Sequence, residues 1–189
     1  MGRVRIIAGT FRSRTLVAPK GTATRPTMDR ARESLFNVLT NVMDIGGAWV
    51  LDLYAGSGAL AFEALSRGAA RATLVDRDRK AIGAIKTNAC SLGVEDRVSI
   101  RQQDAHTFLE RRGDETFNLI FADPPYEEKE LAKLEGLIFE AGWLAPRGHC
   151  IIEHHFDTTL EPVGGAHTVR ELKAGEALFT IFTYLPQIT

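Results

Sequence analysis

The chain has 189 residues, of which 44% are hydrophobic and 25% charged, and its formal net charge is −1. This length predicts one compact domain that buries about 70% of the surface of the unfolded chain. No apolar run approaches the roughly 18 residues of a membrane-spanning helix, and the arginine-rich start lacks the apolar core of a signal peptide, so we expect a cytoplasmic protein.

The small net charge hides a basic amino-terminal segment. Residues 1–32 carry eight basic residues and one acid, a net charge of +7, which leaves −8 for the remainder. Apolar alternation at 3–6 and 15–17 predicts a β-hairpin with arginines on its turn and exposed face. Arginine binds phosphates bidentately and stacks on unpaired bases, so the segment is a candidate RNA contact, with a solvated arm as the alternative. The candidate residues are Arg3, Arg5, Arg12, Arg14, Arg25, Arg30 and Arg32.

A helix is predicted after the hairpin. Its apolar positions recur at helical spacing: Met28, Ala31, Leu35, Val38 and Val42. Pro26 should stop any earlier helix, Thr27 is the expected N-cap, and Arg32 falls off the apolar stripe. This helix could cover a ligand site while presenting Arg25 and Arg30 to RNA, or it could only pack on the edge of a sheet.

The apolar run 48–53 predicts a strand that leads into a glycine turn and a helix. Gly56 and Gly58 let the backbone pass close to a ligand, and the helix start offers free N–H groups. Ala61 stands at the third position of the dinucleotide fingerprint, which accepts Gly or Ala, so glycine spacing alone does not exclude NAD. Asp52 argues against it, because a carboxylate repels a pyrophosphate but suits a cationic amine and sulfonium, as in S-adenosylmethionine. A plain tight turn is the alternative.

Two further strands are predicted to end in acids. Residues 72–75 lead into Asp76, about 20 residues past the glycine turn, where a ribose-binding acid is expected. Residues 98–100 lead into Gln103, Asp104 and Ala105, where a carboxylate could accept from an adenine amino group. A solvated turn aspartate is the alternative for each acid, but acids after four successive strands are hard to assign to chance.

The fourth predicted strand, 117–122, is apolar and ends in Asp123, Pro124, Pro125 and Tyr126. Ligands of open α/β sheets bind at the carboxyl ends of the strands. The prolines remove two backbone donors and fix φ, which leaves carbonyls free to accept from a substrate amine. With the carboxylate and the aromatic ring, the tetrapeptide predicts a slot for a flat polar group such as a nucleobase. A structural Pro-rich turn is the alternative.

The remaining elements complete an α/β pattern. Helices are predicted over 77–92, 104–112 and 127–142, a fifth strand over 150–152, and a terminal strand pair over 168–172 and 178–185. The alternation predicts a doubly wound, Rossmann-like sheet, mostly parallel with one antiparallel strand. Residues 1–26 are expected to form the hairpin extension and residues 27–189 the main domain.

No metal site is expected. Cys90 and Cys150 form no C-x-x-C pair and are predicted to be buried free thiols. His154 and His155 are neighbours on a predicted strand, so their side chains point to opposite faces and make a poor chelate.

The motifs carry a family resemblance. The segments Asp-Leu-Tyr-Ala-Gly-Ser-Gly, Val-Asp, Gln-Asp-Ala and Asp-Pro-Pro-Tyr look like the successive motifs of S-adenosylmethionine-dependent amino-methyltransferases. The run from Thr24 to Asn37, with Arg5-Ile6-Ile7-Ala8-Gly9 before it, further resembles the RsmD family, which methylates N2 of one guanine in bacterial small-subunit ribosomal RNA. The resemblance covers nearly the whole chain and departs at Met28, where a threonine is expected.

This resemblance implies a class I methyltransferase fold, S-adenosylmethionine as methyl donor, and a monomer that acts on small-subunit rRNA, naked or within an assembling 30S particle. The implied catalytic residues are Asp123, Pro124, Pro125 and Tyr126. The implied cofactor-binding residues are Asp52, Ala55, Gly56, Gly58, Asp76, Asp104, Ala105 and Asp123.

Two alternatives stay open at this point. The tetrapeptide is shared with adenine methyltransferases, so the acceptor could be adenine N6 or a protein glutamine, and only the amino-terminal resemblance favours guanine. The second alternative is a non-catalytic RNA-binding module with a vestigial cofactor fold, against which the acids at four strand ends argue.

Overall fold

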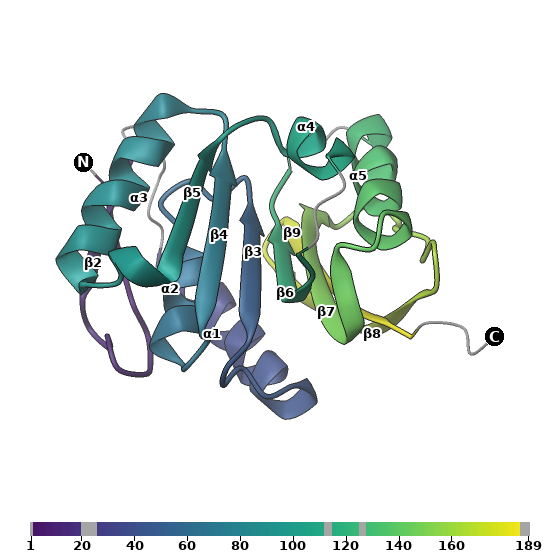
Figure 1. Ribbon diagram of the computed structural model, residues 1–189. Helices are drawn as coiled ribbons and strands as arrows, with labels where there is room; N and C mark the ends of the chain where they lie inside the picture. Colours follow the sequence, from purple (N-terminus) through teal and green to yellow (C-terminus); the bar gives the residue numbers. More distant parts are fainter. Residues whose placement is uncertain (1, 20–25, 112–114, 125–127, 186–189) are drawn as a thin grey trace.

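The structure is a computed structural model that describes residues 2–19, 26–111, 115–124 and 128–185. Its centre is a seven-stranded sheet of order β5-β4-β3-β6-β7-β9-β8 (Figure 1). The parallel strands are β3 (Trp49–Leu53), β4 (Arg71–Asp76), β5 (Val98–Gln102), β6 (Phe117–Ala122) and β7 (Leu144–His155). Strand β9 (Ala177–Tyr184) runs antiparallel to both β7 and β8 (Ala166–Ala174). The predicted sheet with one antiparallel strand is confirmed.

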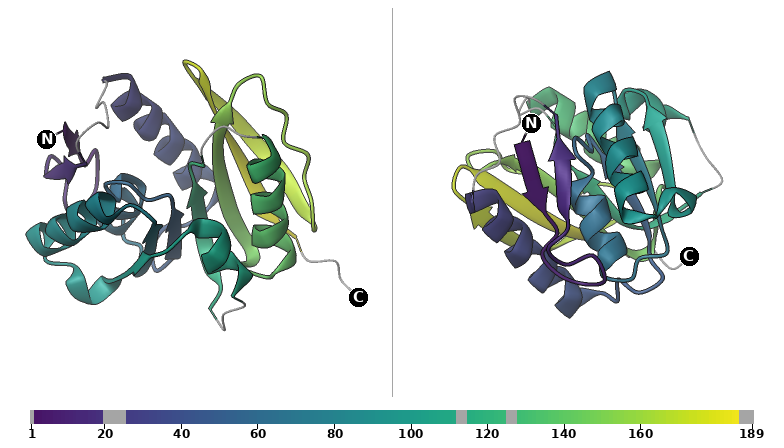
Figure 2. Two further views of the ribbon diagram at one scale, coloured as in Figure 1. Left: turned by 90° about the horizontal axis from the view of Figure 1, so that it is seen from above. Right: turned by 90° about the vertical axis from the view of Figure 1, so that its left-hand side faces the viewer.

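Helices cover both faces of this sheet, as predicted. One face carries α1 (Pro26–Val42), α2 (Ala59–Ser66) and α3 (Arg79–Leu92), and the other carries α4 (Ala105–Glu110) and α5 (Glu128–Glu140). Alternate residues of β6 divide between the two cores. Leu119 and Phe121 belong to the core under α1, α2 and α3, whereas Ile120 and Ala122 belong to the core under α4 and α5. Figure 2 shows α1 and α5 on opposite sides of β7.

The ends of the elements follow local chemistry. Asp78 caps α3 by accepting from the Lys80 N–H at 2.8 Å, and Gly93 (φ 68°) ends the helix before the 3₁₀ turn η1 (Glu95–Arg97). Helix α1 begins at Pro26, so the prediction of Thr27 as N-cap was wrong. Proline is favoured at the first helical position because its missing N–H has no helical partner.

The amino-terminal hairpin packs on the main body. Strands β1 (Gly2–Arg5) and β2 (Thr15–Ala18) pair antiparallel, with Arg3 opposite Val17. Ile6 and Leu16 are buried in the core under α1, α2 and α3. Figure 2 shows the hairpin lying over this helical face, between α1 and α3. The extension therefore shares a hydrophobic core with the rest of the protein.

The two cysteines, the helices and the potential metal ligands bear on further predictions from the sequence. Cys150 is buried, but Cys90 is exposed, so its predicted burial was wrong: it follows the buried Ala89 on α3 and faces outward. None of the helices in the described ranges is long and apolar enough to cross a membrane. Within those same ranges, no group of three or more His, Cys, Asp and Glu side chains could hold a metal ion.

Candidate active site

The four acids predicted for the cofactor site meet at the carboxyl edge of the parallel strands. Strand β3 lies between β4 and β6, and its last residue, Leu53, stands opposite Val75 on one side and Ala122 on the other. Asp76 and Asp123 therefore flank the loop that follows β3. Strand β5 adds Asp104 beyond β4, so the four acidic positions come from four adjacent strands.

The loop after β3 has the backbone that its glycines predict. Gly56 (φ 56°) and Gly58 (φ 75°) are left-handed, and so is Tyr54 (φ 59°), a conformation that is uncommon for an aromatic residue. A Cβ on Gly58 would lie 2.6 Å from the Phe62 ring and 2.7 Å from Leu74, so this position requires glycine. A Cβ on Gly56 would meet nothing nearer than 3.9 Å, which leaves space for a ligand there. We call residues 54–58 the cofactor loop.

Asp76 and β4 hold the cofactor loop in place. The Ala55 N–H donates to the Val75 carbonyl at 3.0 Å. One carboxylate oxygen of Asp76 accepts from the Gly56 N–H at 2.8 Å, and the other accepts from the Asp78 N–H at 2.8 Å. A carboxylate oxygen can accept more than one hydrogen bond, so Asp76 retains capacity for ligand hydroxyls.

Asp52 lies beneath this loop. It is 3% exposed, and its carboxylate accepts from the Ala61 N–H in the first turn of α2 at 3.1 Å. Burial raises the pKa of Asp52 well above its usual range, and the neighbouring Asp123 and Asp76 raise it further. Three carboxyl groups this close favour the approach of a positively charged ligand.

Asp104 caps α4. One of its oxygens accepts from the His106 N–H at 3.0 Å and from the Thr107 N–H at 3.2 Å. The Asp104 side chain is 41% exposed, so its carboxylate also faces solvent, while Ala105 is buried beside it. Asp104, which is predicted to bind an adenine amino group, therefore caps α4 and also remains accessible at the edge of the sheet.

Asp123 and Pro124 follow β6. The Asp123 side chain reaches solvent, but desolvation by the surrounding protein raises the pKa of its carboxyl to about 6. Pro124 is buried and its backbone cannot donate a hydrogen bond. Pro125 and Tyr126 lie outside the described residues. A carboxyl group that titrates near neutral pH can accept a hydrogen bond or a proton from a substrate amine.

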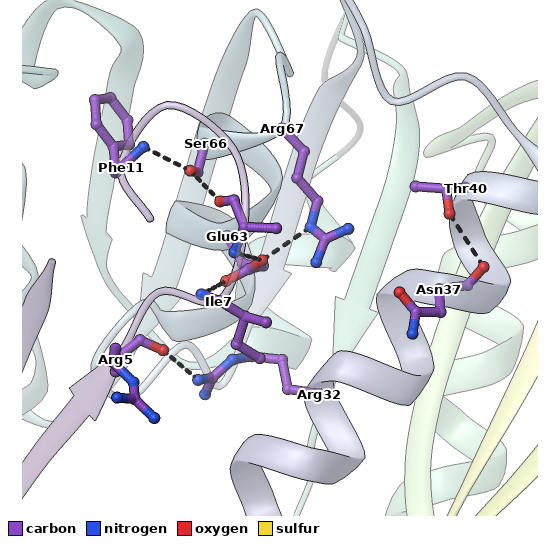
Figure 3. A network of polar contacts seen from close by, with 10 residues as sticks. Arg5, Ile7, Phe11, Arg32, Asn37, Thr40, Glu63, Ser66 and Arg67 are labelled. Carbon is purple, nitrogen blue, oxygen red and sulfur yellow. Dashed lines mark hydrogen bonds and ion pairs between the residues drawn. The ribbon is translucent and has the colours of Figure 1, made fainter. Parts of the chain in front are cut away.

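A polar network fixes the hairpin against α2 (Figure 3). Glu63 is fully buried, and its carboxylate accepts from the N–H groups of Ile7 at 2.7 Å and Ala8 at 3.1 Å and from Arg67 Nε at 2.8 Å. Ser66 accepts from the Phe11 N–H at 2.9 Å and donates to the Ala8 carbonyl at 2.5 Å. The start of α2 follows the cofactor loop, and its later turns hold the hairpin.

The predicted RNA-binding arginines occupy different environments. Arg3, Arg5, Arg12 and Arg30 are exposed, and Arg25 lies outside the described residues. Arg14 is exposed at the hairpin turn and donates to the Ser91 carbonyl at the end of α3.

Arg32 differs from the exposed arginines. It is 8% exposed and donates to the Arg5 carbonyl at 2.6 Å (Figure 3). It also donates to Asp29 at 3.0 Å, and burial lowers its pKa. Its side chain ties α1 to β1, an arrangement that disfavours the predicted contact with RNA.

A second group of basic side chains was missed in the sequence. Arg77, Arg79 and Lys80 follow Asp76 at the start of α3, and all three are exposed. In the sequence, these residues belong to the alternating run Asp-Arg-Asp-Arg-Lys that begins at Asp76. The two acids reduce the net charge of this run to +1, so a search for segments of high net charge finds the amino terminus but not this run. These cations follow Asp76, whose carboxylate binds the cofactor loop, so they belong to the same edge of the sheet.

A doubly wound sheet with a glycine loop after β3, acids after four adjacent strands and an Asp-Pro turn after β6 define a Rossmann-like methyltransferase. The family described as "Conserved hypothetical protein 95" matches residues 4–183. The chain therefore belongs to this family, the RsmD family of rRNA methyltransferases.

Named relatives and a solved structure agree with this assignment. The chain is 41% identical over 164 residues to "Putative rRNA methyltransferase YlbH" of Bacillus subtilis (strain 168), covering 85% of this chain and 88% of that protein. It is 37% identical over 182 residues to "Ribosomal RNA small subunit methyltransferase D" of Escherichia coli (strain K12), covering 96% and 90%. The structure described as "Putative methyltransferase yhhF from Escherichia coli" matches with a TM-score of 0.89 at 36% identity, over 98% of this chain and all of that one.

Proposed function

We propose that this protein transfers a methyl group from S-adenosylmethionine to the exocyclic N2 of one guanine in small-subunit ribosomal RNA. The observation that carries the proposal is the placement of Asp123 and Pro124 next to the cofactor loop, at an edge lined by three further acids. The family relationship supports rRNA as the substrate class. The choice of N2 rests on the resemblance of the amino-terminal run from Thr24 to Asn37 to the RsmD family.

The residues fit the donor chemically. Asp52, Asp76 and Asp123 interact electrostatically, and a bound cationic amine and sulfonium would favour the ionised forms of these carboxyl groups. The backbone at Gly56 leaves space over the loop, Asp76 suits ribose hydroxyls, and Asp104 with Ala105 suits an adenine amino group. When bound, S-adenosylmethionine would supply an electrophilic methyl group.

The reaction is a direct displacement at that methyl carbon. The guanine N2 lone pair forms the new N–C bond as the C–S bond breaks, and S-adenosylhomocysteine leaves with the electron pair. This lone pair is conjugated with the ring, so the amine is a weak nucleophile. Asp123 would accept from one N2 hydrogen and take the proton released, and the Pro124 carbonyl would accept from the other hydrogen, which favours a pyramidal nitrogen and stabilises its developing positive charge.

Substrate positioning is part of the proposal. Tyr126 would stack on the guanine, a contact worth about 1–3 kcal/mol in single-strand binders, with Pro125 shaping the same turn. The target base must leave its stack to reach this edge, so it should be unpaired or flipped. Since all four acid-bearing strands come from one chain, we propose a monomer that acts in the cytoplasm on naked rRNA or on an assembling 30S particle.

The direct test is transfer of a labelled methyl group to small-subunit rRNA, offered naked and as partly assembled particles, with mapping of the modified nucleotide. Label on N2 of a single guanine is the expected result. Label on adenine or on protein would show that the acceptor is another amine and not the guanine N2. If neither substrate nor these alternatives acquires label while S-adenosylhomocysteine binds, the proposed acceptor is wrong.

The exposed arginines of the hairpin should bind phosphates of the RNA. Replacing Arg3 and Arg12 by alanine is expected to weaken rRNA binding and to reduce the slope of log K against log salt by roughly 0.7–0.9 for each phosphate that the variant no longer neutralises. Filter binding at several salt concentrations measures both quantities. Lys133→Ala on α5, remote from the hairpin, is the control with an unchanged slope; equal slopes in all three proteins would contradict the assignment.

A further inference from the structure

A single buried side chain joins the cofactor loop to the hairpin. Asn88 of α3 is 1% exposed. Its Oδ1 accepts from the Val17 N–H at 2.8 Å, and its Nδ2 donates to the carbonyls of Val17 at 2.9 Å and of Ser57 at 2.9 Å. Val17 belongs to β2 of the hairpin, and Ser57 lies in the cofactor loop between Gly56 and Gly58.

These three bonds use both donors of the amide and give its oxygen a donor. Toward Val17, Asn88 acts as a neighbouring strand would, because it pairs with the outward N–H and the outward carbonyl of one β2 residue. Toward Ser57 it supplies a donor that an apolar side chain lacks. Aspartate, the closest in shape, offers no donor to either carbonyl when ionised. The position therefore requires the amide, beyond the packing that a buried helix residue needs.

We propose that Asn88 is a positioning residue that sets the cofactor loop and the hairpin in one arrangement, so that affinity for S-adenosylmethionine and affinity for rRNA both depend on it. This inference rests on the proposed function. Gly56 and Gly58 give the loop access to many backbone conformations, and a bond to the Ser57 carbonyl between them selects one. The same amide anchors the strand that pairs with the arginine-bearing β1.

Two substitutions test this role. Asn88→Ala removes all three bonds, and Asn88→Asp keeps the shape and the acceptor for Val17 while losing both donors. Each is expected to raise the Kd for S-adenosylhomocysteine, measured by calorimetry, by about tenfold and to weaken rRNA binding as well. Thr87→Ala is the matched control: this neighbour on α3 is exposed, its hydroxyl donates to the Gly83 carbonyl at 2.9 Å, and its loss should change neither affinity.

Kinetics separate positioning from a merely structural role. Measured at a temperature where each variant is fully folded, the Asn88 variants should show a raised KM for S-adenosylmethionine with kcat nearly retained. A lowered Tm with unchanged Kd and KM would overturn the inference. Absence of S-adenosylhomocysteine binding by the unaltered protein would instead overturn the proposed function. If Asn88→Ala does not fold, the near-isosteric Asn88→Asp decides by the same measurements.

Discussion

Asp123→Ala is expected to lower the rate of methyl transfer by about 10²–10⁴-fold, because it removes the group proposed to accept the N2 proton and to stabilise the developing charge. Binding of S-adenosylhomocysteine should weaken far less than transfer, since Asp52, Asp76 and the cofactor loop stay intact and this product lacks the sulfonium charge that Asp123 would face. Single-turnover transfer of labelled methyl, alongside calorimetry of the product cofactor, measures the two effects separately. Transfer at the normal rate by this variant would remove Asp123 from the mechanism.

The pH profile provides a second measure of the same group. The raised pKa of Asp123, about 6, means that its carboxyl is largely protonated below that pH and ionised above it. Only the ionised carboxylate can accept a hydrogen bond from N2 and afterwards take up its proton. The transfer rate should therefore rise as the pH increases through about 6 and then level off. Asp123→Asn keeps an acceptor oxygen but cannot take a proton, so its slower rate should lack this step.

Gly9→Ala is expected to destabilise the protein by about 3–5 kcal/mol, the upper range for single substitutions. Gly9 has φ 82°, and a Cβ there would lie 1.9 Å from the Ser66 carbonyl oxygen. The hairpin turn would have to move away, which breaks the bond from the Thr10 N–H to that oxygen at 2.8 Å and exposes Ile6. Denaturant unfolding measures the reduction in stability, and rRNA binding should weaken with it.

Gly47→Ala separates this clash from simple backbone strain. Gly47 has a similar φ of 73°, but a Cβ there meets no atom within 4 Å. Its replacement should cost about 1 kcal/mol, the usual penalty for a left-handed alanine. If Gly9→Ala and Gly47→Ala lower the stability equally, the close packing of the hairpin turn on α2 does not contribute to the stability of the protein as expected.

Local patterns in the sequence predict much of this fold and its site. Hydrophobic periodicity indicates the order of strands and helices. The acids at the ends of the predicted strands 48–53, 72–75, 98–100 and 117–122 do converge, because parallel strands bring their carboxyl ends to one edge. Strand β7 is longer than the expected 150–152, since it begins at Leu144 and includes the polar run Pro146-Arg147-Gly148 that reads as a turn.

The packing of distant segments on one another could not be predicted from these patterns. Glu63 and Asn88 look like solvent-facing polar residues of amphipathic helices. Both are buried because the hairpin packs over them, and they bind hairpin backbone groups that no other strand pairs with. Arg32 likewise lies off the apolar stripe of α1, but β1 covers it. A polar side chain whose partner is the backbone of another element leaves no periodic signal in either segment.

The direction of the hairpin bears on the form of RNA that this protein can use. Its turn, with Arg12 and Arg14, lies beside the ends of α2 and α3, at the edge where the parallel strands begin, as Figure 1 shows for the purple segment at the lower left. Asp123 lies at the opposite edge, about 20 Å away for six-residue strands. An RNA held at both places must therefore span the whole sheet, which favours a folded rRNA segment over an isolated short strand as the object of recognition.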